Sequence, residues 1–474
     1  MKDTSFSRQI RLGLLVLWML TPMAAFSKIW LPSVLSDGMV LQQQSKARLW
    51  GWTTVPSESL TIIGSWNNTP ITVKADKGQW TVALPTPLAG GPYTVTIKGH
   101  ETLVIRDVMI GEVWICSGQS NMEWTPNQGL DNKEAEIAAA NHPNIRFFKV
   151  TRRWSDHPQE DVLGQWQACS PKTLPDFSSV AYFFGRRLQK ELNVPIGLIA
   201  TSWGGTPVET WIPKEVLYAD KELWEASKKI AENPWRPSAP GKAYNGMIHP
   251  LRKIDMAGVI WYQGESNRAN ADSYYQSFPL LIQTWRTIWG KEFPFFFVQL
   301  APFKYDGPEQ RQVAVVRDAQ WHALKTVPKT GMAVTMDIGN LGDIHPTNKQ
   351  DVGKRLALWA LAKTYGKDLL CSGPEFKSFE VKGKKAIVDF YHKGGGLMAS
   401  DKALTYFEVA GKDQVFYPAK ARIKKNKVEV YSDKVKHPVS VRFAFTNGPQ
   451  PNLFNSEGLP ALPFRTDDWP IELE

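Results

Sequence analysis

One serine lies between a glutamine and an asparagine in the stretch GEVWICSGQSNMEW, which runs from Gly111 to Trp124. A serine hydroxyl becomes a nucleophile when an imidazole takes its proton and a carboxylate holds that imidazole in one tautomer. Ser120 follows an apolar run directly. Its position therefore fits two interpretations, a plain turn residue or a nucleophile presented at the end of a strand.

The histidine best placed to act as the base is His345, in the segment LGDIHPTNKQ. The proline after it favours an extended conformation, and Thr347 with Gln350 forms a capping-box pattern that predicts a helix start just beyond. Residues two apart in an extended segment face the same way, so Asp343 is the predicted acid. Asp337, at the end of the preceding apolar run, is the alternative.

The oxyanion of an ester-hydrolysis intermediate needs hydrogen-bond donors that are fixed before the charge develops. Gly204 and Gly205 allow backbone N–H groups to approach a substrate closely. Gln263 and Asn267 offer side-chain amides, and the N–H of Ser120 is a further candidate. The sequence leaves the choice among these donors open.

These residues follow apolar runs that are each long enough for a buried strand, and helix-like segments separate the runs. Such alternation predicts an α/β fold with a parallel sheet and helices on both faces. Ligands of such sheets bind beyond the carboxyl ends of the strands, so the polar residues are expected to meet at one rim. The expected strands are EVWICSG, VPIGLIATSWGG, MAGVIWYQGES, FPFFFVQLAP and GMAVTMDIG, and the clearest expected helices cover residues 180–192, 271–290 and 311–327.

Short stretches with apolar and polar residues in alternation flank this region, as in ITVKADKGQWTVALP and HPVSVRFAF. The pattern predicts β-sandwich-like modules at residues 28–105 and 371–474, around the α/β domain at residues 106–370. Neither module has a cluster of reactive side chains. We expect them to act as scaffold or to shape the substrate cleft.

The first 27 residues have the pattern of a secretory signal peptide. Basic residues precede the apolar segment Leu12–Leu20, and a small-x-small pattern ends at Ser27. The alternative, a membrane anchor, needs about 20 apolar residues, which this segment lacks. We therefore expect an exported protein, periplasmic or secreted, whose mature chain starts near Lys28 and does not stay inserted in the membrane.

The composition excludes some partners. The chain has 474 residues and a formal net charge of +10, but no lysine- or arginine-rich block, so we expect no nucleic-acid partner. Its 3 cysteines have no metal-like spacing, and export permits one disulfide whose pairing the sequence does not give. The 20 tryptophans suit sugar rings, although core packing is expected for most of them.

Four motifs together resemble the sialate O-acetylesterases of the SGNH-hydrolase superfamily: WICSGQSNMEW, TSWGGTPVETW, WYQGESN and DIHPTNKQDVGKRLA. The resemblance implies an SGNH-type sheet and a serine esterase that removes O-acetyl groups from sialic acids without a metal or an organic cofactor. By motif, Ser120 is the nucleophile and His345 the base, and Gly204 or Gly205 forms the oxyanion hole with the loop 263–267. The superfamily places its acid three residues before the histidine, where this chain has Gly342.

Three functional hypotheses follow. The first is the sialate O-acetylesterase, and the second is an esterase with the same chemistry on acetylated xylan or another glycan. Screening of substrates separates these two. The third is a carbohydrate-binding protein without catalysis, whose mark would be an incomplete set of catalytic residues, and the sequence has a complete set.

Overall fold

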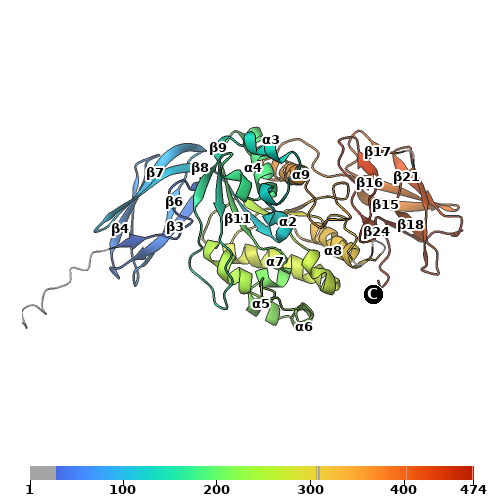
Figure 1. Cartoon of the computed structure of the whole chain (residues 1–474), viewed down its shortest axis with the longest axis horizontal. Helices are drawn as coiled ribbons and strands as arrows, with labels where there is room; N and C mark the ends of the chain where they lie inside the picture. Colours follow the sequence, from blue (N-terminus) through green and yellow to red (C-terminus); the bar gives the residue numbers. More distant parts are fainter. Residues whose placement is uncertain (1–27, 306, 308–309, 402, 472, 474) are drawn as a thin grey trace, which may run out of the picture.

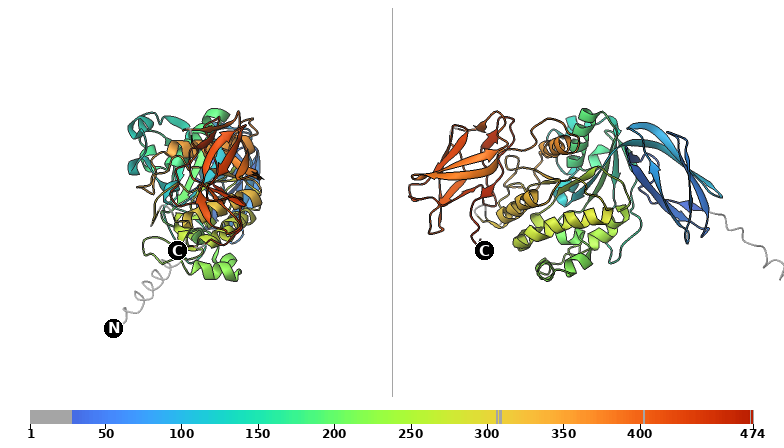
Figure 2. Two further views of the ribbon diagram at one scale, coloured as in Figure 1. Left: turned by 90° about the vertical axis from the view of Figure 1, so that its right-hand side faces the viewer. Right: turned by 180° about the vertical axis from the view of Figure 1, so that it is seen from behind.

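The computed structural model describes residues 28–305, 307, 310–401, 403–471 and 473. The predicted signal peptide, residues 1–27, lies outside these described residues. The molecule is elongated, with a β module at each end and a mixed α/β region between them (Figure 1). The right-hand view of Figure 2, from behind, also places the two β modules at opposite ends of the long axis. In the described part of the chain, no helix is long and apolar enough to cross a membrane.

The central sheet contains the five expected strands, and they run parallel to one another. A sixth parallel strand, which the sequence interpretation missed, pairs with β11. Strand β8 lies between β11 and β12, so the strand order reverses at β8, and ligands of such sheets bind beyond the carboxyl ends of the strands at this point. In order across the sheet the strands are β10 (Trp166–Cys169, antiparallel to its neighbour), β9 (His142–Lys149), β11 (Ile196–Ser202), β8 (Thr102–Gly118), β12 (Gly258–Tyr262), β13 (Phe295–Val298) and β14 (Thr330–Ala333).

Helices cover both faces of this sheet (Figure 1). On one face Trp114 of β8 meets Phe184 of a helix edge to face, with ring centroids 5.0 Å apart. On the other face Trp261 of β12 meets Trp285 of another helix at 5.9 Å. The first face carries α4 (Ser179–Leu192) and α9 (Lys349–Lys363), the second carries α7 (Tyr274–Trp289) with α8 (Gln312–Thr326) beside it, and the short helices are α2 (Ser120–Glu123), α3 (Lys133–Ala138), α5 (Lys214–Tyr218) and α6 (Lys221–Ser227).

The N-terminal module shares a strand with the central sheet. The first half of β8 pairs with β7 and the second half with β11 and β12, so one strand runs through both regions. The remaining strands form a separate small sheet and the outer part of the large one. They are β1 (Ile29–Trp30), β3 (Lys46–Thr53) and β6 (Gln79–Pro85) in the small sheet, and β2 (Val40–Gln42), β4 (Ser59–Gly64), β5 (Pro70–Lys74) and β7 (Gly90–Lys98) in the large one.

The C-terminal module consists of two four-stranded antiparallel sheets and a two-stranded ribbon. Phe390 of one sheet and Phe464 of the other meet edge to face at 5.9 Å, so the two sheets pack against each other. The strands are β15 (Glu375–Lys382), β16 (Lys385–Tyr391), β21 (Lys427–Tyr431) and β20 (Lys420–Lys424); β19 (Phe416–Pro418), β18 (Phe407–Ala410), β22 (Ser440–Phe443) and β24 (Phe464–Arg465); and β17 (Leu397–Ala399) with β23 (Leu453–Asn455).

One local prediction is wrong. Helix α9 is capped by Asn348, whose side chain accepts a hydrogen bond from the N–H of Asp351 at 3.0 Å, and not by the predicted pair Thr347 and Gln350. The Thr347 hydroxyl donates instead to Asp131 at 2.6 Å. The helix therefore begins one residue later than the capping-box pattern indicates.

Candidate active site

Ser120 is the first residue of α2, two residues beyond the end of β8. The turn between them needs glycine at position 118, where φ is +137° and a Cβ would lie 2.2 Å from the carbonyl oxygen of Tyr262. The N–H of Gln119 donates to that same carbonyl at 2.9 Å. The chain thus turns sharply against β12 and presents the serine hydroxyl at the carboxyl end of β8, where the strand order reverses.

His345 approaches Ser120 from the loop between β14 and α9. Its Nε2 lies 2.9 Å from the Oγ of Ser120. The imidazole stacks on the Trp124 ring, with centroids 4.0 Å apart and planes 12° apart. The side chain of Asn121 donates to the carbonyl of Ile344 at 3.0 Å. Helix α2 and the residue after it therefore both carry the serine and hold the histidine loop in place.

Of the two candidate acids, Asp343 lies beside the imidazole. Its Oδ1 accepts the backbone N–H of His345 at 2.8 Å and is 3.6 Å from the ring Nδ1, which is longer than a hydrogen bond. Both carboxylate oxygens of Asp337 accept hydrogen bonds from Arg355, each at 2.6 Å. Asp337 is thus engaged in an ion pair with Arg355, while Asp343 lies beside the His345 ring.

The surroundings of His345 favour its neutral form. Burial lowers the pKa of His345, and the positive charge of Lys349 lowers it further, while Asp343 acts in the opposite direction. A neutral imidazole can accept a proton, whereas an imidazolium cannot. The ring that contacts Ser120 is therefore in the protonation state that a general base requires.

A buried polar network lies beneath this pair. The ammonium of Lys349 donates to the Asn121 side chain at 2.6 Å, and the amide of Asn121 donates to Glu265 at 2.6 Å. Burial lowers the pKa of Lys349 to about 7 and raises the pKa of Glu265. The sequence interpretation missed Asn121 and Lys349 as site residues. The sequence did show that Asn121 is next to Ser120 and that Lys349 is close to His345. It contains no pattern from which the burial of a lysine at a helix start could be predicted.

Gly204 lies next to the serine in the loop after β11. A Cβ at this position would be 3.4 Å from the Cβ of Ser120, and the backbone N–H of Gly204 donates to Glu123 at 2.9 Å. Gly205 has φ of +72°, and its carbonyl accepts a hydrogen bond from Arg236. The N–H of Ser120 heads α2, where no carbonyl of that helix can accept its bond.

The side-chain amides of Gln263 and Asn267 are buried and engaged elsewhere. Gln263 donates to the Thr206 carbonyl at 3.2 Å and to the Asn267 Oδ1 at 2.7 Å. Asn267 donates to both oxygens of Glu209, at 3.1 and 2.9 Å. This network ties the loop after β12 to the loop after β11. It uses the amide protons of both residues, so the structure does not support their predicted role as oxyanion donors.

A cleft of about 620 Å³ lies alongside α2. Glu123 stands between this cleft and Gly204, and it is ion-paired with Arg152 at 2.5 Å. The cleft is large enough for a sugar residue and more. The remaining walls come from Thr125, Asn127, Gln128, Lys149, Val150, Thr151, Asp176, Ser178, Ala200 and Ser202.

Two other expectations concern cysteines and metals. Cys116, Cys169 and Cys371 are buried and unpaired, so the described residues contain no disulfide. Among these residues there is also no group of three or more His, Cys, Asp or Glu side chains placed to hold a metal ion.

A serine hydroxyl in contact with an imidazole, at the carboxyl edge of a largely parallel sheet, is the arrangement of a serine-type hydrolase. The chain belongs to the carbohydrate esterase family described as sialic acid-specific acetylesterases, whose sequence model matches residues 110–362. The protein is thus a carboxylic ester hydrolase, and the hypothesis of a binding protein without catalysis is set aside.

Similar proteins cover most of the chain. The sialate O-acetylesterases of Homo sapiens and Pongo abelii are each 34% identical over 396 residues, which is 75% of this chain and 75% of each relative. The sialate O-acetylesterase of Rattus norvegicus is 31% identical over 423 residues, 75% of this chain and 78% of the relative. The crystal structure of a carbohydrate acetylesterase from Xanthomonas citri is 41% identical, covers 93% of this chain and 100% of its own, and superposes with a TM-score of 0.85.

Proposed function

We propose that this esterase removes O-acetyl groups from sialic acids, as a member of the SGNH-hydrolase superfamily, with Ser120 as the nucleophile and His345 as the base. The observation that carries the proposal is the 2.9 Å contact between the Ser120 Oγ and the His345 Nε2. The names of the mammalian sialate O-acetylesterases support the choice of sugar.

The reaction proceeds in two halves. The Ser120 oxygen attacks the acetyl carbonyl as His345 takes its proton, and the tetrahedral intermediate expels the sugar oxygen, which receives that proton. Water then attacks the acetyl-serine with His345 again as the base, and acetate leaves as Ser120 regains its hydrogen. The stacked Trp124 ring keeps the imidazole in one orientation through both halves.

For the oxyanion hole we favour backbone donors, the N–H groups of Ser120 and Gly204. Both lie at the nucleophile, and backbone donors need no reorganisation when the charge develops. Glu123 accepts the Gly204 N–H at 2.9 Å, so the carboxylate has to release it when substrate enters. For the acid we retain Asp343, since its carboxylate is 3.6 Å from the His345 Nδ1.

The decisive experiment measures acetate release by the purified protein from O-acetylated sialic acids. We expect turnover by the wild type, none by Ser120→Ala, and no loss of rate in a metal chelator. If the wild type hydrolyses 4-nitrophenyl acetate but releases no acetate from any O-acetylated sialic acid, sialic acid is rejected as the substrate and the esterase activity is retained.

A second candidate substrate is acetylated xylan or another acetylated glycan. It is favoured by the likeness to the Xanthomonas citri protein, whose description is that of a carbohydrate acetylesterase without mention of sialic acid. Acetylated xylan in the same assay tests it directly, and a higher kcat/KM on xylan than on sialic acid would make it the better assignment.

We also propose that the protein is exported and matures by cleavage before Lys28. The support is the signal-peptide pattern of residues 1–27. Amino-terminal sequencing of the protein from the periplasm or medium of an expressing bacterium tests this, and an intact Met1 would reject it.

A further inference from the structure

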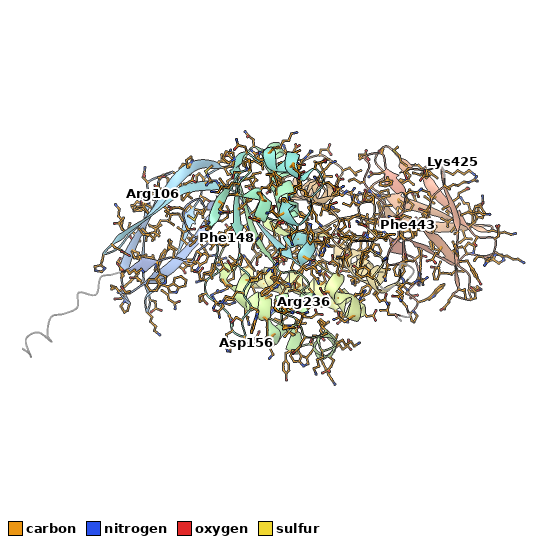
Figure 3. All side chains as sticks on the ribbon, viewed as in Figure 1. Arg106, Phe148, Asp156, Arg236, Lys425 and Phe443 are labelled. Carbon is orange, nitrogen blue, oxygen red and sulfur yellow. The ribbon has the colours of Figure 1, made fainter. Side chains whose placement is uncertain are left out.

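The side chain of Arg236 lies against the loop that borders the nucleophile. Its Nη1 donates to the carbonyl of Gly205, the residue after the glycine that adjoins Ser120. Arg236 comes from the segment between α6 and the next helical turn, on the side of the central region where Figure 3 also labels Asp156. The guanidinium therefore contacts the residue that follows Gly204, and Gly204 adjoins Ser120.

This guanidinium has no counter-ion among the residues that the structure describes. Its single hydrogen bond within that part of the chain goes to the Gly205 carbonyl, and its Nε is buried without a partner. Burial lowers the pKa of Arg236, and no carboxylate offsets the effect. Arg355 shows the ordinary arrangement, with a bidentate bond to Asp337. A half-buried and unpaired cation is costly, which indicates that an anion completes the site.

Arg236 lines a second cleft, of about 310 Å³, which is the size of a small-molecule site at the lower end of the usual range. Trp154 forms one wall and is 49% exposed, so the part of its ring that Lys242 leaves open can lie against a sugar ring. The ammonium of Lys242 lies 4.3 Å from the centre of that ring and pairs with Asp156 at 3.1 Å. Asn233 adds a polar side chain. This cleft therefore combines an aromatic platform with a cation.

We propose that Arg236 binds the carboxylate of an acetylated sugar acid that lies on Trp154 while its acetyl ester reaches Ser120. The inference rests on the proposed function and deepens it, because a sialic acid carries a carboxylate and a neutral xylan residue does not. A guanidinium donates charge-assisted hydrogen bonds to a carboxylate, and Arg236 lines the cleft in which that carboxylate would lie. Glu232 also lines the cleft, but it is exposed and makes no ion pair with Arg236.

The test compares kcat/KM for an O-acetylated sialic acid, its carboxyl methyl ester and 4-nitrophenyl acetate, with acetate release as the readout. Wild type is expected to prefer the free acid over the methyl ester by about ten- to hundredfold, the usual value of a hydrogen bond to a charged group. Arg236→Gln loses that preference, so its kcat/KM falls further on the free acid than on the methyl ester or 4-nitrophenyl acetate, and Arg236→Lys falls between. The matched control Arg106→Gln, a charge removal on the N-terminal module, changes none of the three rates (Figure 3).

The outcomes separate the two proposals. Equal turnover of the acid and its methyl ester by wild type overturns carboxylate binding and leaves the sialic acid esterase standing. Turnover of 4-nitrophenyl acetate with neither sugar overturns both. A fall on all three substrates in Arg236→Gln, equal in size, means that Arg236 merely supports the Gly205 loop, which also rejects the proposal. If this variant does not fold, the wild-type comparison of acid and methyl ester still decides.

Discussion

At the scale of single residues, the proposed chemistry depends on how the imidazole of His345 is held. Trp124 fixes its plane, the Ser120 hydroxyl bonds to Nε2, and the loop carbonyl before it is bound by Asn121. Its Nδ1 has the weakest contact, a carboxylate at 3.6 Å whose side chain is 53% exposed. The proposed acid, Asp343, is therefore less constrained than the acid of a buried triad, and we infer that Trp124 also orients the imidazole.

The first prediction separates the two aspartates. Asp343→Asn is expected to lower kcat by about 10²-fold, which is less than the roughly 10⁴-fold effect of a buried acid, because Asp343 is half exposed. Asp337→Asn leaves kcat within a few fold but lowers the free energy of unfolding by about 3 kcal/mol, because it leaves Arg355 buried with its charge uncompensated. Steady-state kinetics and urea unfolding of both variants check this. The reverse pattern would mean that Asp337 is the acid.

The second prediction concerns Lys349. Its positive charge lowers the pKa of His345, so Lys349→Met raises that pKa and moves the acidic limb of the kcat/KM profile to higher pH. The sign follows because a base with a higher pKa becomes protonated, and so inactive, at a higher pH. Lys349 has a pKa of about 7, so it is mostly charged in the range where His345 titrates.

The control for this charge removal is Lys354→Met, on the exposed face of the same helix. Solvent screens that distant charge, so its profile should match the wild type. An acidic limb that stays in place in Lys349→Met, or moves to lower pH, would contradict the electrostatic role. Loss of rate without any change of profile would mean that Lys349 acts by holding Asn121 alone.

Residues that are recognised by their place after an expected strand could be predicted from the sequence. The hydrogen-bond partners of buried side chains could not. Ser120 and His345 were found because both follow expected strands, and the structure places them in contact. The roles of Gln263 and Asn267 were predicted from their side-chain chemistry, yet the buried acceptor Glu209 takes up the amide of Asn267. Which hydrogen bonds a side chain makes depends on neighbours that are distant in sequence.

At the scale of elements, the turn from β8 into α2 sets the position of Ser120, the proposed nucleophile. The register of β8 with β12 brings the carbonyl of Tyr262 against Gly118, and a helical turn begins two residues later. Glycine at position 118 thus allows the chain to pass close to β12 as it turns from the strand into the helix. A Cβ at this position would collide with the Tyr262 carbonyl.

The third prediction follows from that contact. Gly118→Ala places a Cβ 2.2 Å from a backbone carbonyl at a φ of +137°, so we expect it to lower the free energy of unfolding by about 3 kcal/mol or more and to abolish activity. Gly290→Ala is the matched control, with φ of +62° and nothing within 4 Å of the added atom. It should cost about 1 kcal/mol and leave kcat unchanged. Equal losses in urea unfolding would show that backbone conformation, and not the contact, determines the effect.

Elements with long apolar runs were predictable, and short ones were not. The strands β11 to β14 and the helices α4, α7 and α8 were expected, since their apolar patterns are continuous. Strand β9 was missed because HPNIRFFK mixes charged and apolar residues. This segment is a strand because it pairs in parallel with β11, which is distant in sequence. The start of α9 was misplaced by one residue, since Thr347 and Asn348 are both good capping residues and the contact of Thr347 with Asp131 decides between them.

At the scale of the whole molecule, the two β modules are joined to the centre in different ways. The N-terminal module shares the continuous strand β8 with the central sheet, so its removal would also cut the strand that presents Ser120. The C-terminal module shares no strand with the central sheet. Its contacts with the central region include Arg317 of α8, which is buried and donates to the carbonyls of Thr446 and Asn447 at 2.7 and 2.8 Å.

The last prediction tests that junction. Arg317 also donates to the carbonyls of Leu300 and Ala301, at 2.7 and 3.0 Å, so one guanidinium satisfies four carbonyl groups from the central sheet and the C-terminal module. Arg317→Met would leave these acceptors without their donor, at about 1 to 3 kcal/mol for each buried one. We expect the free energy of unfolding to fall by more than about 3 kcal/mol, and calorimetry to show the C-terminal module melting before the rest.

Arg311→Met is the control at the same boundary, because Arg311 is partly exposed and pairs with Glu408 at 3.5 Å, and such a pair contributes less than about 1 kcal/mol. If both variants lose the same small amount and melt in one transition, the modules are held together by their packed surfaces and Arg317 is not the junction.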